Sequence, residues 1–285
     1  LSSYYILTKE IVEIIWNISL VGTSRGSAGS FLICYLLEIT QINPIIYGLD
    51  DWRHISADRP ELPDIDIDSQ AGERANILDL IKQKYGYDRV LNICTFKTEK
   101  TASAIQTIAR GMGIDVNDAK YLSSLVVAEG TGTKTVKQCI EEYGKNSACT
   151  RFIDELKKVD EIFNGFIENI MRIEGLSVGR SIHASGVYIF PCHYTEMNSM
   201  MKSPNGVPTT QFDMGDSDMM GGLKVDMLTI EGLDRIRKTM DLLLKDNKIE
   251  LQGSLKETYD KYLHPAVLEY DSQEMWQLLF SGELI

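Results

Sequence analysis

The chain has 285 residues, 44% of them hydrophobic and 25% charged, and its formal net charge is −12. This composition supports a buried core and excludes a disordered chain, and the length suits one to three domains of about 100 to 200 residues each. The acidic balance counts against a basic nucleic-acid surface, although carboxylates that hold divalent metal ions would also make a chain acidic. No apolar run approaches the ~20 residues of a membrane span, so a membrane partner is not expected.

Five cysteines are scattered along the chain without a CxxC pair, at positions Cys34, Cys94, Cys139, Cys149 and Cys192. Their odd number and spacing predict neither a disulfide framework nor a zinc site. A reducing, cytoplasmic location fits this cysteine usage best. The chain starts at Leu1 without a visible signal peptide and ends at "SGELI", so we expect it to be a piece of a longer polypeptide.

The first quarter of the chain predicts two helices and two strands around a glycine-rich turn. Residues 9–16 show the pattern of the end of an amphipathic helix, and residues 18–22 that of a short apolar strand. A second helix is expected over residues 31–38. Residues 44–63 contain prolines and glycines and predict irregular structure, after which an acidic strand begins.

The rest of the chain alternates between strand and helix patterns. In order, we expect a helix over 71–85, a strand over 89–96, mostly helix over 98–172 with a Gly/Thr-rich break at 129–135, strands over 182–190 and 221–230, a helix to 244 and short helices beyond it. A sheet interrupted by a helical insertion explains this order most economically. The predicted class is therefore α+β with a mixed sheet.

The turn "GTSRGSAGS", residues 22–30, leads from the predicted strand into a helix. Backbone N–H groups at the start of the helix, with the hydroxyls of Ser27 and Ser30, can bind an anion. Gly26 allows the close approach of a ligand, and Arg25 offers a bidentate fork for phosphate. The alternative is an ordinary helix N-cap in which glycine serves only the turn.

The segment "ELPDIDIDSQ", residues 61–70, places Asp64, Asp66 and Asp68 on alternate positions. Because a strand has a side-chain period of two, the three carboxylates would share one face of the strand. Mg²⁺ takes hard oxygen ligands, and two such ions can be bridged by neighbouring carboxylates, which would cancel the repulsion between them. The alternative is a solvated edge strand, because edge strands also use charge.

A further carboxylate, Asp226, lies between Val225 and Met227 in "LKVDML". Burying a lone carboxylate in an apolar strand is costly unless it is paired or bound to metal. This observation favours the metal interpretation, although an outward-facing residue on an alternating strand would look the same.

These motifs together resemble the catalytic core of the bacterial C-family replicative DNA polymerases, the DNA polymerase III alpha subunits. The resemblance rests on "VGTSRGSAGS", "LPDIDIDS", "IHASGVYIF", "TTQFDM" and "LKVDMLTIEGLDRI", which are similar to family elements in the same order. It covers about residues 10–245, and the tail resembles the beginning of the fingers. The divergent motifs are more similar to a phage or mobile-element version than to a main bacterial replicase.

The resemblance implies a nucleotidyltransferase palm of the polymerase β-like type, with a mixed sheet and a helical thumb inserted into it. The implied division is palm over 1–97, thumb over 98–172, palm again over 173–245 and truncated fingers over 246–285. Asp64, Asp66 and Asp226 match the family's catalytic metal ligands, which hold two Mg²⁺ ions with Mn²⁺ as a substitute. Asp68 matches an acid placed behind the site.

The resemblance also implies a set of triphosphate contacts. These are Arg25, Gly26, Ser27, Ser30, Arg53, Arg59, Arg180, His183 and Lys224. Surface salt bridges are the alternative for Arg53 and Arg59, and a core histidine is the alternative for His183. The chain departs from the family pattern at Ser69, Ala102, Ile182 and Ser185, and Lys97, Lys100 or Arg110 can take the place of the lysine expected at 102.

The implied function is template-directed DNA synthesis, in which a primer 3′-hydroxyl attacks the α-phosphate of a deoxynucleoside triphosphate (dNTP). The implied partners are primer-template DNA, a dNTP, the rest of the polymerase chain and a sliding clamp. An untemplated nucleotidyltransferase with the same palm is an alternative, and a non-catalytic relic that binds DNA or protein ranks last because all three acids are present. The fragment is expected to be folded even if it is inactive alone.

Overall fold

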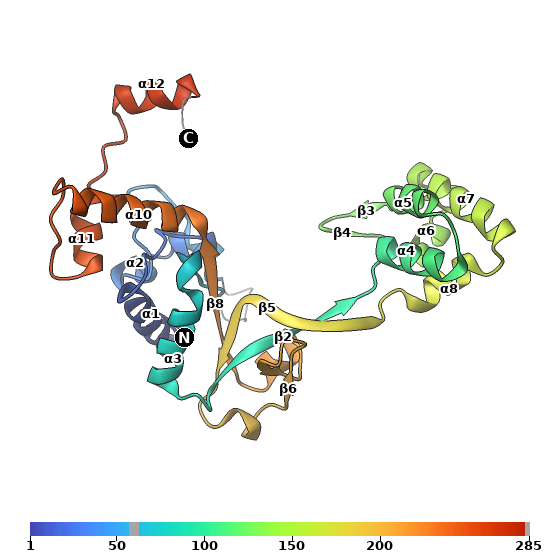
Figure 1. Ribbon diagram of the computed structural model, residues 1–285, viewed down its shortest axis with the longest axis horizontal. Helices are drawn as coiled ribbons and strands as arrows, with labels where there is room; N and C mark the ends of the chain where they lie inside the picture. The colour runs from blue at the N-terminus through green and yellow to red at the C-terminus, as the bar shows by residue number, and fades with distance from the viewer. Residues whose placement is uncertain (57–62, 283–285) are drawn as a thin grey trace. The chain divides into compact units, whose positions relative to one another are not determined.

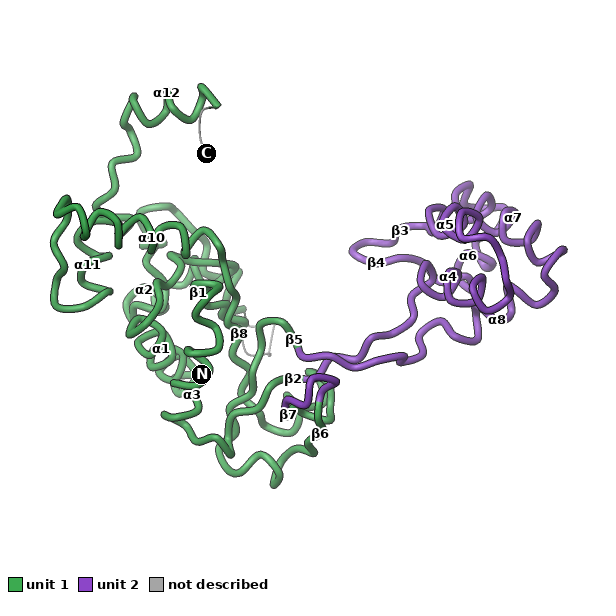
Figure 2. The backbone as a smooth tube through the Cα atoms, in the orientation of Figure 1, with its two compact units in different colours: residues 1–93, 183–202, 208–285 green, residues 94–182, 203–207 purple. Residues whose placement is uncertain are grey.

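The computed structural model of the protein describes residues 1–56 and 63–282 (Figure 1). The chain divides into two compact units (Figure 2). The first unit holds residues 1–93, 183–202 and 208–285, and the second holds residues 94–182 and 203–207. Each unit has its own buried hydrophobic core. Among the described helices, none is long and apolar enough to cross a bilayer.

The first unit is built on a mixed six-stranded sheet with the strand order β1-β8-β5-β2-β7-β6. Its strands are β1 (Asp66–Gln70), β2 (Val90–Thr98), β5 (Ser177–Ile189), β6 (Met200–Lys202), β7 (Pro208–Thr210) and β8 (Leu223–Ile230). β1 runs parallel to β8, whereas β5 runs antiparallel to β8. The predicted α+β class and mixed sheet are therefore confirmed.

Several helices of this unit pack on its core through apolar side chains. The helices of the first unit are α1 (Ser2–Trp16), α2 (Leu32–Leu36), α3 (Arg74–Tyr85), α9 (Met214–Met219), α10 (Glu231–Lys245), α11 (Leu255–Tyr262) and α12 (Gln273–Ser281). In α1 the buried residues recur three or four positions apart, which is the spacing of one helix face. Ile65 and Ile67 beside β1 are buried in the same core, and this fixes which side chains of the acidic segment can face outward.

The structure corrects several sequence-based expectations in this unit. Residues 18–22 form no strand, and only Val21 makes an isolated bridge to Ser69. The acidic strand begins at Asp66, so Asp64 precedes it. The helix predicted over 31–38 is present as the shorter α2, and the glycine/serine turn before it contains the 3₁₀ turn η1 (Gly26–Ser30). The short strands β6 and β7 were not expected, because three residues are too few to show alternation.

The second unit is mainly helical, as the sequence predicts. It contains α4 (Thr101–Met112), α5 (Val116–Ser124), α6 (Val136–Glu141), α7 (Ser147–Ile162) and α8 (Phe166–Ile173), with β3 (Ala128–Glu129) and β4 (Gly132–Thr133). The Gly/Thr-rich break expected at 129–135 is the hairpin of β3 and β4 and the turn after it. Glycine suits this position, because Gly130 has a φ of 55°.

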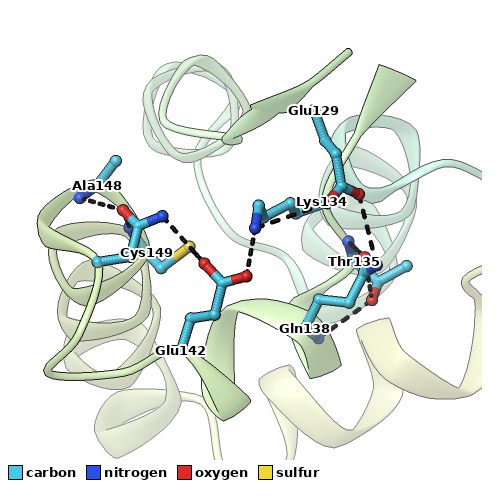
Figure 3. A network of polar contacts seen from close by, with 8 residues as sticks. Glu129, Lys134, Thr135, Gln138, Glu142, Ala148 and Cys149 are labelled. Carbon is cyan, nitrogen blue, oxygen red and sulfur yellow. Dashed lines mark hydrogen bonds and ion pairs between the residues drawn. The ribbon is translucent and has the colours of Figure 1, made fainter. Parts of the chain in front are cut away.

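A polar network ties this hairpin to the helices of the second unit (Figure 3). The Lys134 ammonium contacts the carboxylates of Glu129 and Glu142. Glu142 also accepts hydrogen bonds from Asn146 Nδ2 at 3.0 Å and from the Cys149 thiol at 3.6 Å. The charged groups of this network contact one another, so we interpret the network as part of the structure of this unit.

Candidate active site at strands β1 and β8

The register of two neighbouring strands brings the predicted acids Asp66 and Asp226 together. β1 and β8 are parallel, and Asp66 lies opposite Asp226 in their ladder. Burial of Ile65, Ile67 and Met227 in the core turns the intervening acidic side chains away from it. The spacing within the sequence and the pairing between strands therefore place both carboxylates at one location.

Asp64, Asp66 and Asp226 form a cluster in which one carboxylate oxygen of each lies within 4.8 Å of the others. Asp64 is exposed, Asp66 is half-buried and Asp226 is buried. Burial raises the pKa of the Asp66 carboxyl, and the charges of Asp64 and Asp226 raise it further, whereas Arg25 and Lys224 oppose this shift. The cluster thus concentrates negative charge that a divalent cation would neutralise.

Lys224 lies beside this cluster. Its ammonium is 2.6 Å from Oδ2 of Asp226 and 3.6 Å from Oδ1 of Asp64. Although burial alone would lower the pKa of Lys224, the two carboxylates raise it above its ordinary value. In the structure Lys224 is therefore a charged partner of the predicted metal ligands.

The segment His183 to Gly186 closes the other side of Asp226. Ser185 Oγ donates to Oδ1 of Asp226 at 3.2 Å. The Gly186 amide donates to Nδ1 of His183 at 2.8 Å, so this ring nitrogen acts as an acceptor. A Cβ on Gly186 would lie 2.7 Å from Ile93 Cδ1 and 3.1 Å from Asp226 Oδ1. Ser185 contacts the cluster directly, whereas His183 supports the turn next to it.

The glycine/serine turn lies next to the cluster on the β1 side. The Gly22 amide donates to the Asp68 carbonyl at 3.0 Å, and Arg25 Nε donates to Oδ1 of Asp68 at 3.0 Å. Gly26 has a φ of 59°, and a Cβ there would lie 3.8 Å from Oδ2 of Asp66. Asp68 therefore anchors the turn through Arg25, which brings Gly26 close to the cluster.

The two serines of the turn have different surroundings. Ser30 is buried and its hydroxyl donates to the Ser27 carbonyl at 2.8 Å, as a turn cap does. The Ser27 hydroxyl lies 3.0 Å from Nδ1 of His54. Ser30 thus serves the turn, while the Ser27 hydroxyl lies on the lining of a cavity and its contact with a ligand stays a prediction.

His54 is a site neighbour that sequence reasoning missed. It is buried between the rings of Tyr5 and Phe31, and its Nε2 lies 4.0 Å from the Cys34 sulfur. Burial lowers the pKa of His54 to about 4, so the imidazole is neutral at physiological pH. A single histidine in an irregular segment carried no signal that could have identified this role.

A cavity of about 460 Å³ opens beside these groups. It is lined by Ser27, His54, Asp64 and Lys224 together with Tyr4, Pro63, Met214, Asp218, Gly222 and Leu223. Its size and its mixture of apolar walls with a few polar groups are those of a small-ligand site. Met214 and Asp218 belong to α9, and Asp218 Oδ1 accepts a hydrogen bond from Tyr188 at 2.6 Å.

Of the three other predicted arginine contacts, one lies in the described part of the first unit. Arg53 is exposed in the 3₁₀ turn η2 (Asp51–Arg53) and does not line it. Arg59 lies outside the described residues. Arg180 belongs to the second unit, and so do Ala102 and Ile182. For Arg53, Arg59 and Arg180 a triphosphate contact stays a prediction.

Comparison with known proteins shows which family the chain is similar to. The family model described as "Bacterial DNA polymerase III alpha NTPase domain" matches residues 1–229. The chain is 48% identical over 290 residues to the "Probable DNA polymerase YorL" of Bacillus subtilis (strain 168) and to the "DNA-directed DNA polymerase" of Bacillus phage SPbeta, which covers 100% of this chain and 22% of each relative.

A third relative is the "DNA polymerase III subunit alpha" of Thermus aquaticus, which is 32% identical over 263 residues, 92% of this chain and 20% of the relative. The chain thus spans about a fifth of the length of these curated relatives. This chain therefore belongs to the bacterial DNA polymerase III alpha family.

Proposed function

We propose that this chain is the palm and thumb part of a DNA polymerase that extends a primer on a template by two-metal nucleotidyl transfer. The observation that carries this proposal is the cluster of Asp64, Asp66 and Asp226, whose carboxylate oxygens lie within 4.8 Å of one another. Membership of the polymerase family and similarity to a phage DNA-directed DNA polymerase support it.

The donor set of the cluster fits two Mg²⁺ ions, or Mn²⁺ in their place. Three carboxylates supply only hard oxygen ligands, which these ions prefer. Asp64 and Asp66 would bridge the pair, and Asp226 would complete the coordination of one ion. When bound, the ions would lower the pKa of the primer 3′-hydroxyl and stabilise the charge of the triphosphate.

The chain itself would position the dNTP. The cavity lined by Ser27, Asp64 and Lys224 lies next to the carboxylates, and Arg25 and Gly26 belong to the turn that forms one side of the site. Backbone amides of this turn and the Ser27 hydroxyl would bind the β- and γ-phosphates. Lys224 would add a positive charge to the same end of the triphosphate.

We propose the palm over 1–97 and 173–245, the thumb over 98–172 and the start of the fingers over 246–285. Residues 94–182 carry twelve lysines and arginines and twelve aspartates and glutamates, so the acidic balance of the chain lies outside the mainly helical unit. Such a unit can grip duplex phosphates without reading sequence. The other partners in this proposal are the rest of the polymerase chain and a sliding clamp.

The decisive experiment is primer extension by the full-length polymerase with Asp66→Asn. Asp246→Asn, at an exposed position after α10, is the matched control. We expect Asp66→Asn to reduce templated extension at least about 100-fold, because it removes a ligand of the metal ions that stabilise the transition state, and Asp246→Asn to leave it unchanged. Extension that persists in Asp66→Asn would refute the assignment, and equal extension without a template would indicate an untemplated nucleotidyltransferase.

A further inference from the structure

The ladder between β5 and β8 ends at the site. Its last pair is Gly186 opposite Asp226, and the antiparallel register would make Ser185 and Met227 the next pair. From Asp226 to Ile230, β8 pairs with β1, which lies on the side of β8 away from β5. Asp226 therefore lies where β5 leaves β8, and its position depends on what holds the two strands at this point.

Arg74 lies where β5 separates from β8 and contacts both strands. Its Nη1 donates to the Met227 carbonyl at 3.0 Å and to the Ser185 carbonyl at 3.3 Å. One guanidinium thus connects the two backbone positions that the ladder leaves unpaired. Arg74 is the first residue of α3, and the salt bridges found in the described part of the chain do not include it. Since no described carboxylate pairs with the Arg74 guanidinium, its hydrogen bonds to the two backbone carbonyls are what compensates its partial burial.

Ser185 carries this connection to the carboxylate. Its side chain is buried, with 8% of the residue exposed, and its hydroxyl donates to Oδ1 of Asp226 at 3.2 Å. Its amide lies 3.3 Å from Nδ1 of His183. Ser185 is thus held at its amide by His183 and at its carbonyl by Arg74, which aims the hydroxyl at one oxygen of Asp226.

We propose that Arg74 and Ser185 are positioning residues for the carboxylate of Asp226 in metal binding. Ser185 occupies Oδ1, so Oδ2, the oxygen that contacts Lys224 in this structure, is left for a cation. Arg74 holds the carbonyls on both strands, so the Asp226 carboxylate keeps its place beside Asp64 and Asp66. This inference rests on the proposed metal site and extends it to two residues that do not touch the metal.

The test is calorimetric titration of the full-length polymerase with Mn²⁺. Binding that disappears in Asp66→Asn defines the site. We expect Ser185→Ala to weaken this binding about tenfold and Arg74→Met about 10- to 100-fold, the range found when residues that orient metal ligands are removed. Arg74→Lys should lie between Arg74→Met and the wild type, because one ammonium replaces only part of the fork.

The matched control is Arg237→Met, because Arg237 is a half-buried arginine of the same unit that pairs with Asp241 on α10. It should leave Mn²⁺ affinity unchanged. Wild-type affinity in Ser185→Ala and Arg74→Met, even with a lower melting temperature, would overturn the proposal. If Arg74→Met does not fold, Ser185→Ala decides alone. Absence of Asp66-dependent Mn²⁺ binding in the wild type would overturn the metal site itself, and this inference with it.

Discussion

Lys224 Nζ lies 2.6 Å from Oδ2 of Asp226, so a protein cation contacts the carboxylate that is assigned to a metal ion. The same ammonium is 3.6 Å from Asp64. Lys224 thus neutralises part of the charge of the cluster when no metal is bound. Binding of Mg²⁺ would supply that charge instead and release the lysine toward the triphosphate.

We therefore expect Lys224→Met to destabilise the metal-free protein by about 1–3 kcal/mol, because it leaves the buried Asp226 carboxylate with one partner fewer. Saturating Mg²⁺ should reduce this deficit. Urea unfolding with and without Mg²⁺ measures both quantities, and the exposed Lys238→Met on α10 is the control. If Lys224→Met lost the same free energy of unfolding with and without Mg²⁺, Lys224 and the metal ion would not neutralise the same carboxylate.

Gly186 is expected to tolerate no side chain. A Cβ there would approach Ile93 Cδ1 to 2.7 Å, and both Asp226 and His183 to 3.1 Å. Gly186→Ala should destabilise the protein by about 1–3 kcal/mol through overpacking, and it should also lower Mn²⁺ affinity by displacing Asp226. Thermal unfolding and metal titration measure the two effects.

Gly232→Ala provides the comparison for this variant. A Cβ at Gly232, in the first turn of α10, would meet its nearest atom at 3.5 Å, which is ordinary contact. It should therefore leave stability unchanged or increase it slightly. Unchanged stability and metal affinity in Gly186→Ala would mean that β5 can move away from Asp226 without cost.

His54 should make stability depend on pH below neutrality. Its pKa is about 4 in the fold, whereas an unperturbed histidine has a pKa of about 6.5. The unfolded chain therefore binds a proton more readily, and the stability that neutral His54 contributes is present above pH 6.5 and lost as the pH falls toward 4. The loss amounts to about 2–3 kcal/mol.

His54→Gln removes this titration while keeping a polar group beside Ser27. Urea unfolding at a series of pH values should show a smaller loss of stability between pH 6.5 and 4 in the variant than in the wild type. Between pH 7 and 8 the two profiles should run parallel, which serves as the internal control. Parallel profiles over the whole range would show that His54 does not titrate in this way.

Asp68 is expected to affect the binding of dNTP, through Arg25, and not the binding of the metal ions. It lies on β1 and its carboxylate accepts a hydrogen bond from Arg25 at 3.0 Å, and Arg25 belongs to the glycine/serine turn. Because the Arg25 side chain is 44% exposed, solvent screens the pair and Asp68→Asn should cost only about 1 kcal/mol of stability. The loosened turn should nevertheless bind dNTP several-fold more weakly.

Calorimetry with a dNTP and with Mn²⁺ separates these effects for Asp68→Asn. We expect the Mn²⁺ affinity to stay within about twofold of the wild type, which is the scatter of such comparisons between independent sites. Asp79→Asn on the exposed face of α3 controls for loss of a surface charge. Tighter dNTP binding in Asp68→Asn would mean that Asp68 holds Arg25 away from the phosphates.

Much of the site follows from local patterns. The period of two in "DIDID" already places Asp64 and Asp66 on the side opposite Ile65 and Ile67, because buried isoleucines and outward acids cannot share a strand face. The helix over 71–85 and the strands near 89–96 and 221–230 have clear periodicity, and the structure has them within a few residues of the predicted limits.

Short or weakly patterned segments were not predictable in the same way. Residues 18–22 are apolar enough for a strand, yet they lie in the core beside β1 with only the bridge from Val21 to Ser69. Burial of an apolar run does not require that it pair with a sheet, so composition alone could not decide between the two.

The sequence by itself determined the chemistry of the protein: the acids at alternate positions, the glycine/serine turn and the lone Asp226, each recognisable from its immediate neighbours. Only the tertiary structure decided which further side chains support this site, because Ser185, Arg74 and His54 contact partners distant in sequence. Strand register and helix placement bring such partners together, and both result from packing of the whole core, which no local spacing encodes.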